Sequence, residues 1–165
     1  MEKSAMVSLI VYAVIVVLVI ASVVIYLASN TSAPRPVSFE LNNRTYQISA
    51  YAYTPQQQQK GLMNATVTNT TFMLFSFGRP GIYYFWMKDT YSPLDIIWLN
   101  YSASNHSARV VYIVNATPCV SYSQNQTDCK IYDPGANANY VLEAKAGFAE
   151  SSGMGVGSNV KFLFK

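Results

Sequence analysis

Residues 83–100 read YYFWMKDTYSPLDIIWLN and place three charged side chains, Lys88, Asp89 and Asp95, inside the most aromatic part of the chain. Only 12% of all residues are charged, so this grouping draws attention to a possible site. Aromatic rings can stack on a sugar or a peptide, while lysine and carboxylate groups can hydrogen-bond it. The candidate ligand-binding residues are therefore Tyr84, Trp86, Lys88, Asp89 and Asp95.

A β-hairpin would bring these candidates together. If residues 83–88 and 95–100 pair through a loop from 89 to 94, one register places Lys88 opposite Asp95, with Trp86 and Tyr84 on the same face. Two interpretations stay open. The pair is either a cross-strand ion pair, worth about 1 kcal/mol at most when exposed, or part of a ligand platform. Cross-strand packing is the commoner role of aromatic residues at strand spacing.

Catalysis would need more than this segment supplies. Asp89 and Asp95 could act as acid and base only if their carboxyl groups converge, and they stand at the two ends of one expected loop. His106 lies in the polar stretch SASNHSA, with no nucleophile elbow in the sequence. We assign no catalytic residue and favour a non-enzyme, with a hydrolase using Asp89 and Asp95 as the alternative.

Two other positions have a structural interpretation. Gly61 is expected to end a helix in a left-handed conformation, with Leu62 and Met63 entering the core. Glu143 alternates with Leu142 in YVLEAKA, which favours an outward carboxylate. The alternative for Glu143 is a buried partner of Lys88 or Arg109.

The cysteines predict a disulfide. Cys119 and Cys129 are the only two, and a short loop closed between them would stabilise the fold by about 2.5 to 3 kcal/mol. Two thiolates would need two more ligands to hold zinc, and His106 is the only histidine. We therefore expect no metal and no cofactor.

An apolar segment dominates the N-terminal part. Residues 6–28 carry no charge and as a helix would span the ~30 Å hydrocarbon layer. The segment is longer than a secretory apolar region and lacks a good cleavage site, which favours an uncleaved anchor. The predicted organisation is a short cytoplasmic tail at 1–5, a transmembrane anchor at 6–28, a linker at 29–36 and an extracytoplasmic β domain at 37–165.

Asparagine usage indicates which side of the membrane the domain occupies. Eight of the twelve asparagines lie in N-x-[ST] acceptors. Besides Asn30, the glycosylation candidates are Asn43, Asn64, Asn69, Asn100, Asn105, Asn115 and Asn125. With the disulfide, they predict a single-pass cell-membrane protein whose C-terminal domain lies outside. The formal net charge of +3 is too small to indicate nucleic-acid binding.

The outer domain is predicted to be mainly β. Short segments rich in Val, Ile, Tyr and Phe alternate with turn formers, which is typical of a single compact antiparallel sandwich or small barrel of about eight strands. One short helix is expected, with Thr54 as N-cap, Pro55 at the first position and Gly61 at its end. The expected strands are 37–42, 44–53, 71–77, 82–88, 95–100, 108–116, 140–146 and 160–164, the first two forming a hairpin.

Several motifs resemble a known family. They are GLM (61–63), MLFSF (73–77), FWMKDT (85–90), PLDIIWL (93–99), VVYIVNATPC (110–119), YVLEAKAG (140–147) and GVGSNVKF (155–162). In this order they resemble domain-of-unknown-function family 192 over residues 38–162. The resemblance implies a compact, mostly β domain of roughly 110 residues, often exported and without an established activity.

Together these features predict a membrane-anchored cell-surface domain that binds a glycan or an envelope protein. The alternatives are a hydrolase acting on envelope glycans or peptides, and a structural spacer or assembly partner. The oligomeric state does not follow from the sequence.

Overall fold

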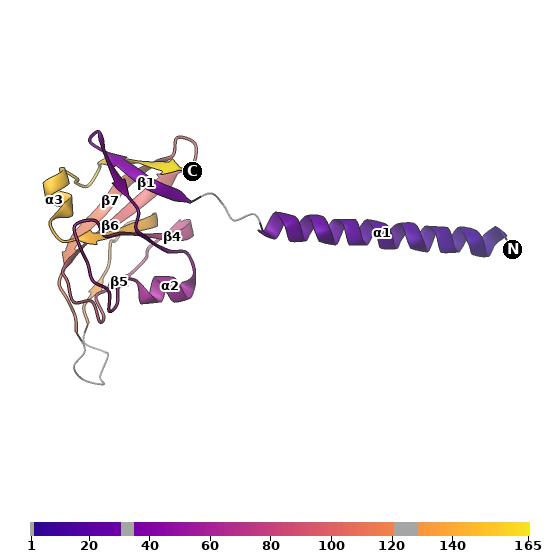
Figure 1. Cartoon of the computed structure of the whole chain (residues 1–165), viewed down its shortest axis with the longest axis horizontal. Helices are drawn as coiled ribbons and strands as arrows, with labels where there is room; N and C mark the ends of the chain where they lie inside the picture. Colours follow the sequence, from indigo (N-terminus) through magenta and orange to yellow (C-terminus); the bar gives the residue numbers. More distant parts are fainter. Residues whose placement is uncertain (1, 31–34, 121–128) are drawn as a thin grey trace. The chain divides into compact units, whose positions relative to one another are not determined.

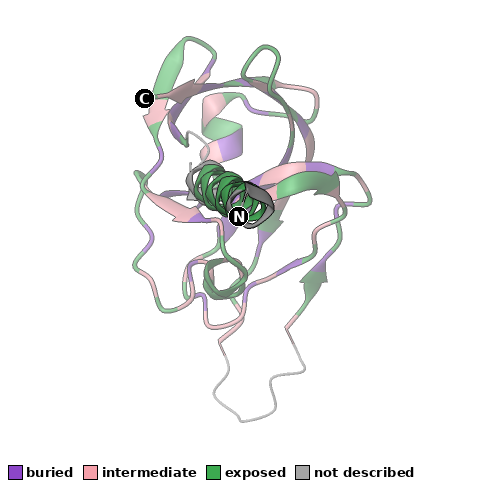
Figure 2. Ribbon diagram, turned by 90° about the vertical axis from the view of Figure 1, so that its right-hand side faces the viewer, coloured by how far each residue is buried: buried purple, intermediate pink, exposed green. Residues whose placement is uncertain are grey.

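The computed structural model describes residues 2–30, 35–120 and 129–165. The chain divides into two units, Met1–Pro34 and Arg35–Lys165 (Figure 1). In the first, helix α1 (Glu2–Asn30) contains the span Met6–Ile25, with a mean hydropathy of 3.1. Every side chain from 6 to 25 is exposed (Figure 2). This helix is long and apolar enough to cross a membrane, and it is compatible with an anchor or with a signal sequence.

The second unit is built around one eight-stranded sheet that curls into a half-barrel (Figure 2). Its strand order is β2 (Arg44–Gln47), β1 (Pro36–Leu41), β10 (Asn159–Phe164), β7 (Ser107–Ala116), β6 (Leu94–Ser102), β9 (Ala138–Lys145), β4 (Phe72–Gly81) and β3 (Ala50–Ala52). Neighbours are antiparallel except β3 and β4, which are parallel. A separate ribbon pairs β5 (Phe85–Trp86) with β8 (Ile131–Tyr132). The expected mainly β class is confirmed.

The central strands are buried on both faces. On β4, Leu74 belongs to one core cluster and its neighbour Phe75 to the other. On β6, every residue from Leu94 to Leu99 is buried. Near-continuous apolar runs are the sequence counterpart of such two-sided burial. Helix α3 (Phe148–Ser152) contributes to the first cluster, and the turn after helix α2 (Pro55–Lys60) contributes to the second.

Local sequence signals place the first hairpin and helix α2. Asn42 and Asn43, with φ of 50° and 61°, connect β1 to β2 as expected for a two-residue hairpin turn. Thr54 caps α2 in a reciprocal capping box with Gln57. Gly61 follows the helix with φ 48° and ψ −134°, so its φ is positive but its ψ lies outside the left-handed helical region that we expected.

The hairpin predicted across residues 83–100 is wrong. Strand β5 pairs with β8, which we did not predict, and β6 lies between β7 and β9. Asp95 is therefore registered with Asn115 and Ala144 and not with Lys88. The reason is that β7 and β9 offer β6 long apolar partners on both edges, leaving no edge for β5.

Candidate functional site

Glu143 lies on β9 with only 4% of its surface exposed, which contradicts the expected outward carboxylate. Its strand partners are Met73 on β4 and Ile96 on β6. Alternation fails as a guide here because a central strand covered on both faces has no solvent side. Within the described residues, the Oε2 atom of Glu143 has no hydrogen-bond partner. Burial was part of the alternative expectation for Glu143, but among the described residues Oε2 accepts no hydrogen bond from Lys88 or Arg109.

Burial changes the protonation of this group. Desolvation raises the pKa of Glu143 to about 8, because a carboxylate loses its hydration in an apolar environment. At pH 7 Glu143 is thus mainly a neutral carboxylic acid, able to donate one hydrogen bond as well as accept others.

Glu143 is one of the residues that line a small cavity of about 20 Å³, which we call the Glu143 cavity. This volume is enough for one water-sized atom. Gly61 forms part of its wall, and a Cβ added there would lie 3.7 Å from Oε2 and 3.4 Å from the Phe75 Cζ atom. The cavity is lined by Gln58, Gln59, Lys60, Gly61, Leu62, Met63, Phe75, Phe85, Trp86, Lys88, Thr90 and Glu143.

A larger groove of about 430 Å³ adjoins the cavity, and we call it the α2 groove. It is lined by Gln56, Gln59, Lys60, Met63, Asn64, Trp86 and Lys88. Five of these residues also line the Glu143 cavity, namely Gln59, Lys60, Met63, Trp86 and Lys88. The two spaces therefore share a wall. The motifs GLM, FWMKDT and YVLEAKAG, far apart in sequence, meet at this place.

Helix α2 is held against the sheet by side-chain contacts. The Gln58 amide donates to the Ser76 carbonyl of β4 at 2.7 Å. The backbone N–H of Asn64 donates to the Asp89 carbonyl at 2.8 Å, which joins the turn after α2 to the opposite wall. These bonds fix the position of Lys60 on one side of the groove relative to Lys88 on the other.

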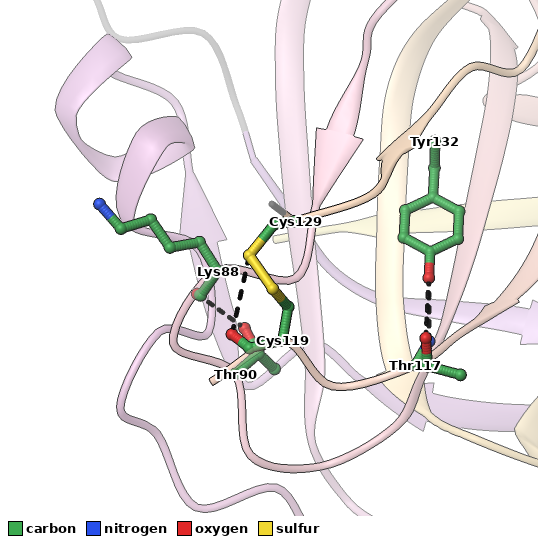
Figure 3. The surroundings of a disulfide bond; sticks show 6 residues. All are labelled: Lys88, Thr90, Thr117, Cys119, Cys129 and Tyr132. Atoms are coloured by element: carbon green, nitrogen blue, oxygen red, sulfur yellow. Dashed lines mark hydrogen bonds between the residues drawn. A yellow bond between two sulfur atoms is a disulfide. The ribbon is translucent and has the colours of Figure 1, made fainter. Parts of the chain in front are cut away.

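The disulfide supports the second wall. Cys119 and Cys129 are bonded, as predicted, and Figure 3 shows Lys88 and Thr90 beside them. The Asp89 N–H donates to the Cys119 carbonyl at 2.8 Å, and the Cys119 N–H donates to the Met87 carbonyl at 3.3 Å. The cross-link thus lies directly behind the segment that carries Lys88.

Two lysines contribute positive charge to the described lining of the α2 groove. Among the described residues that line the groove and the cavity, Lys60 and Lys88 carry charge, while Glu143 is mainly neutral at pH 7. The Lys88 Nζ atom lies 5.5 Å from the centre of the Trp86 ring, a cation–π contact that orients both side chains. The groove can therefore attract an anionic ligand and offer it an aromatic face.

The predicted ligand-binding residues separate into two groups. Trp86 and Lys88 line the groove, and the Asp89 backbone helps to build its wall. Tyr84 is 61% exposed and does not line the groove. Asp95 is buried elsewhere, where Oδ1 accepts from the Asn115 amide at 3.0 Å and Oδ2 accepts from the Ala149 N–H at 2.8 Å.

Asp95 thereby acts as a remote cap for α3, whose own N-cap, Gly147, has no side chain. Asp89 and Asp95 share no hydrogen-bond partner among the described residues. The structure gives no support to a catalytic pair formed by these two carboxylates.

Sequence reasoning missed Lys60, the α2 amides and the inward direction of Glu143. One available signal was the run YVLEA, in which a single acid interrupts an apolar stretch typical of a strand buried on both faces. Glu143 and helix α2 are far apart in the sequence, so no short sequence pattern predicts that they line the same cavity.

The glycosylation candidates lie on the surface wherever they are described. Asn125 lies outside the described residues, and so does the side chain of Asn30. The exposed ones are Asn43, Asn64, Asn69, Asn100, Asn105 and Asn115. Exposure is what glycosylation requires, and glycan occupancy stays a prediction.

The fold is a compact β half-barrel, and the turn at Gly61 and the aromatic segment with Trp86 meet beside the buried Glu143 to form a candidate ligand site. The model of the DUF192 family, described as an uncharacterised ACR, matches residues 38–162, and the chain belongs to this family. This confirms the resemblance seen in the sequence.

The solved structures that resemble the chain include the following two proteins. One is a suspected transcription regulator from Sinorhizobium meliloti 1021, with 28% identity and a TM-score of 0.60, covering 81% of this chain and 98% of that one. The other is a protein of unknown function from Novosphingobium aromaticivorans DSM 12444, with 26% identity and a TM-score of 0.60, covering 81% and 96%. No curated protein matches the chain.

Proposed function

We propose that this protein is a membrane-tethered cell-surface domain that binds an acidic carbohydrate of the cell envelope in the α2 groove. The observation that carries the proposal is the groove lining, which combines an aromatic ring, two lysines and three side-chain amides.

Each part of this lining suits one feature of such a ligand. The Trp86 ring offers an apolar face on which a sugar ring can stack. The amides of Gln56 and Gln59 both donate and accept, as paired sugar hydroxyls require. The two ammonium groups match carboxylates on the saccharide. Pockets of several hundred Å³ with a few convergent polar groups are the usual form of small-ligand sites.

The cellular location is part of the proposal. Helix α1 has the length and composition of a membrane anchor, the disulfide suits an oxidising compartment, and the exposed sequons suit a displayed surface. A saccharide of the envelope would be within reach of a domain held there by a short tether.

The test uses the full chain in lipid nanodiscs and isothermal titration calorimetry. The acidic probe is trigalacturonate, with its methyl-esterified neutral form and poly-glutamate as comparisons. We expect trigalacturonate to bind more tightly than either. Trp86→Ala and Lys60→Gln should each weaken binding about ten-fold, which corresponds to about 1.4 kcal/mol.

The control is Tyr84→Ala, because this exposed tyrosine lies on the same segment but does not line the groove. Its affinity should stay within about two-fold of the unmodified chain, as is usual for isolated surface substitutions. The proposal is overturned if trigalacturonate does not bind, if poly-glutamate binds better, or if Trp86→Ala has no effect.

A further inference from the structure

We propose that the protonated carboxyl group of Glu143 is a hydrogen-bond donor to one oxygen atom of the saccharide bound in the α2 groove, so that binding depends on pH. This inference rests on the proposed function and adds a specific contact and its regulation.

The first support is the unsatisfied state of the group. Glu143 is almost fully buried, and its Oε2 atom has no hydrogen-bond partner among the described residues. A buried polar atom without a partner carries a substantial free-energy cost. A ligand oxygen placed beside Oε2 would remove that cost in the complex, which favours binding.

The second support is space. The Glu143 cavity has about the volume of one oxygen atom with its hydrogens, and it shares walls with the groove. A hydroxyl or carboxylate oxygen projecting from a sugar in the groove is of the right size to enter it. Gly61 keeps this space open, since a Cβ there would point toward Oε2 and Phe75.

The third support is the charge around the group. Lys60 faces the cavity from the end of α2, and Lys88 faces it from the segment after β5. The neighbouring positions on β4 and β6 are Met73 and Ile96, which carry no charge. Below its pKa of about 8, Glu143 keeps its proton and can donate a hydrogen bond to the ligand oxygen. Above it, the group becomes an anion that can only accept and that repels an acidic saccharide. Affinity must then fall as pH rises through this range.

The experiment measures trigalacturonate binding to the full chain in nanodiscs at pH 6.5 and pH 9.0. We expect the unmodified chain to bind about ten-fold more weakly at pH 9.0, the change that one pH unit above the pKa produces. Glu143→Gln keeps a neutral donor at both values, so its affinity should change by about two-fold or less. The matched control Glu150→Gln removes an exposed acid on α3 and should keep the unmodified pH profile.

A second measurement does not depend on the variant folding. The carboxyl ¹³C resonance of Glu143 in the unmodified chain is titrated with and without saturating trigalacturonate. Because the saccharide binds the protonated form better, it must raise the pKa of Glu143, by about one unit for a ten-fold difference in affinity.

The outcomes separate the two proposals. If trigalacturonate binds and Trp86→Ala weakens it, but Glu143→Gln keeps the unmodified pH profile or the Glu143 pKa does not move, the inference is overturned and the proposed function stands. If trigalacturonate binds at neither pH, both are overturned.

Discussion

Glu143 is a buried carboxyl group that lowers the stability of the fold and that is able to hydrogen-bond a ligand. It replaces what could be an apolar side chain in the second core cluster, beside Phe75 and Phe85. Among the described residues the fold supplies no partner for its Oε2 atom. A buried acid whose Oε2 atom has no partner in the fold is a candidate for contact with a ligand.

The same residue predicts a pH dependence of stability. The pKa of Glu143 is about 8 in the folded chain and near 4.5 when unfolded, so the folded state holds more protons between these values. The free energy of unfolding should therefore fall as pH rises from 5 to 8, by at most about 1.4 kcal/mol per pH unit. The contribution of the raised Glu143 pKa to the free energy of unfolding is fully present below pH 4.5 and is lost as pH rises to about 8.

Chemical denaturation of the full chain in nanodiscs at pH 5, 6, 7 and 8 would measure this slope. Glu143→Gln cannot ionise and should show a flatter profile, while Glu150→Gln should follow the unmodified chain. Parallel profiles for the unmodified chain and Glu143→Gln would show that Glu143 titrates normally in the folded state.

Asp95 shows the opposite use of a buried acid. Both of its oxygens accept hydrogen bonds, from Asn115 on β7 and from the N-terminus of α3. A satisfied carboxylate that joins a strand to a helix stabilises the fold and has little left with which to bind a ligand. The local sequence does not show which of these two buried acids has its oxygens satisfied by hydrogen bonds.

Among the elements, α2 and the turn after it decide the shape of the site. The helix begins at a capping box, ends at Lys60 and passes into Gly61, whose backbone approaches the sheet closely. A side chain at this position would require a strained backbone and would project toward the Glu143 cavity.

Gly61→Ala is therefore expected to reduce the free energy of unfolding by about 1 to 3 kcal/mol, the usual cost of a residue in a sparsely populated backbone region. The matched control is Gly155→Ala, since this glycine has no positive φ and a Cβ there would meet nothing within 4 Å. Denaturation curves compare the two. Equal losses would contradict the role assigned to the Gly61 backbone.

The ribbon of β5 and β8 with the disulfide forms the other wall. A ribbon of two residues per strand has little stability of its own. Cys119 exchanges backbone hydrogen bonds with Met87 and Asp89, and its disulfide bond to Cys129 ties the residues just before β8 to the same segment. The cross-link therefore compensates for the weak pairing of the segment that carries Trp86 and Lys88.

For the whole molecule, the decisive question is whether α1 remains attached. An anchor keeps the chain in the membrane, whereas a signal sequence is removed and releases the domain. The proposed function needs the first outcome.

We expect the chain to stay in the membrane fraction after an alkaline carbonate wash of the cells that make it. Protease added outside intact cells should digest residues 35–165 and leave a fragment containing α1, because the proposed function places the domain on the outer side. A cytoplasmic protein serves as the control for intact membranes. A released domain beginning after α1 would identify a signal sequence, and protection from protease would place the domain inside.

Local features of this protein followed from its sequence because neighbouring residues determine them. The Asn42 and Asn43 turn, the Thr54 cap, the apolar α1 segment and the bond between Cys119 and Cys129 were all predicted. Most strand segments and the family also followed, since apolar periodicity and contiguous motifs carry them. The expected strand 44–53 divides into β2 and β3, and of the expected strand 82–88 only Phe85–Trp86 forms a strand.

Only the tertiary structure decided which strands pair and which face each side chain takes. The sequence of residues 83–100 predicts a hairpin. In the structure β6 pairs with the longer strands β7 and β9, and β5 pairs with β8. Because of this pairing, Lys88 does not lie opposite Asp95 and instead lines the Glu143 cavity. Strand pairing depends on total burial across the sheet, which no short segment encodes.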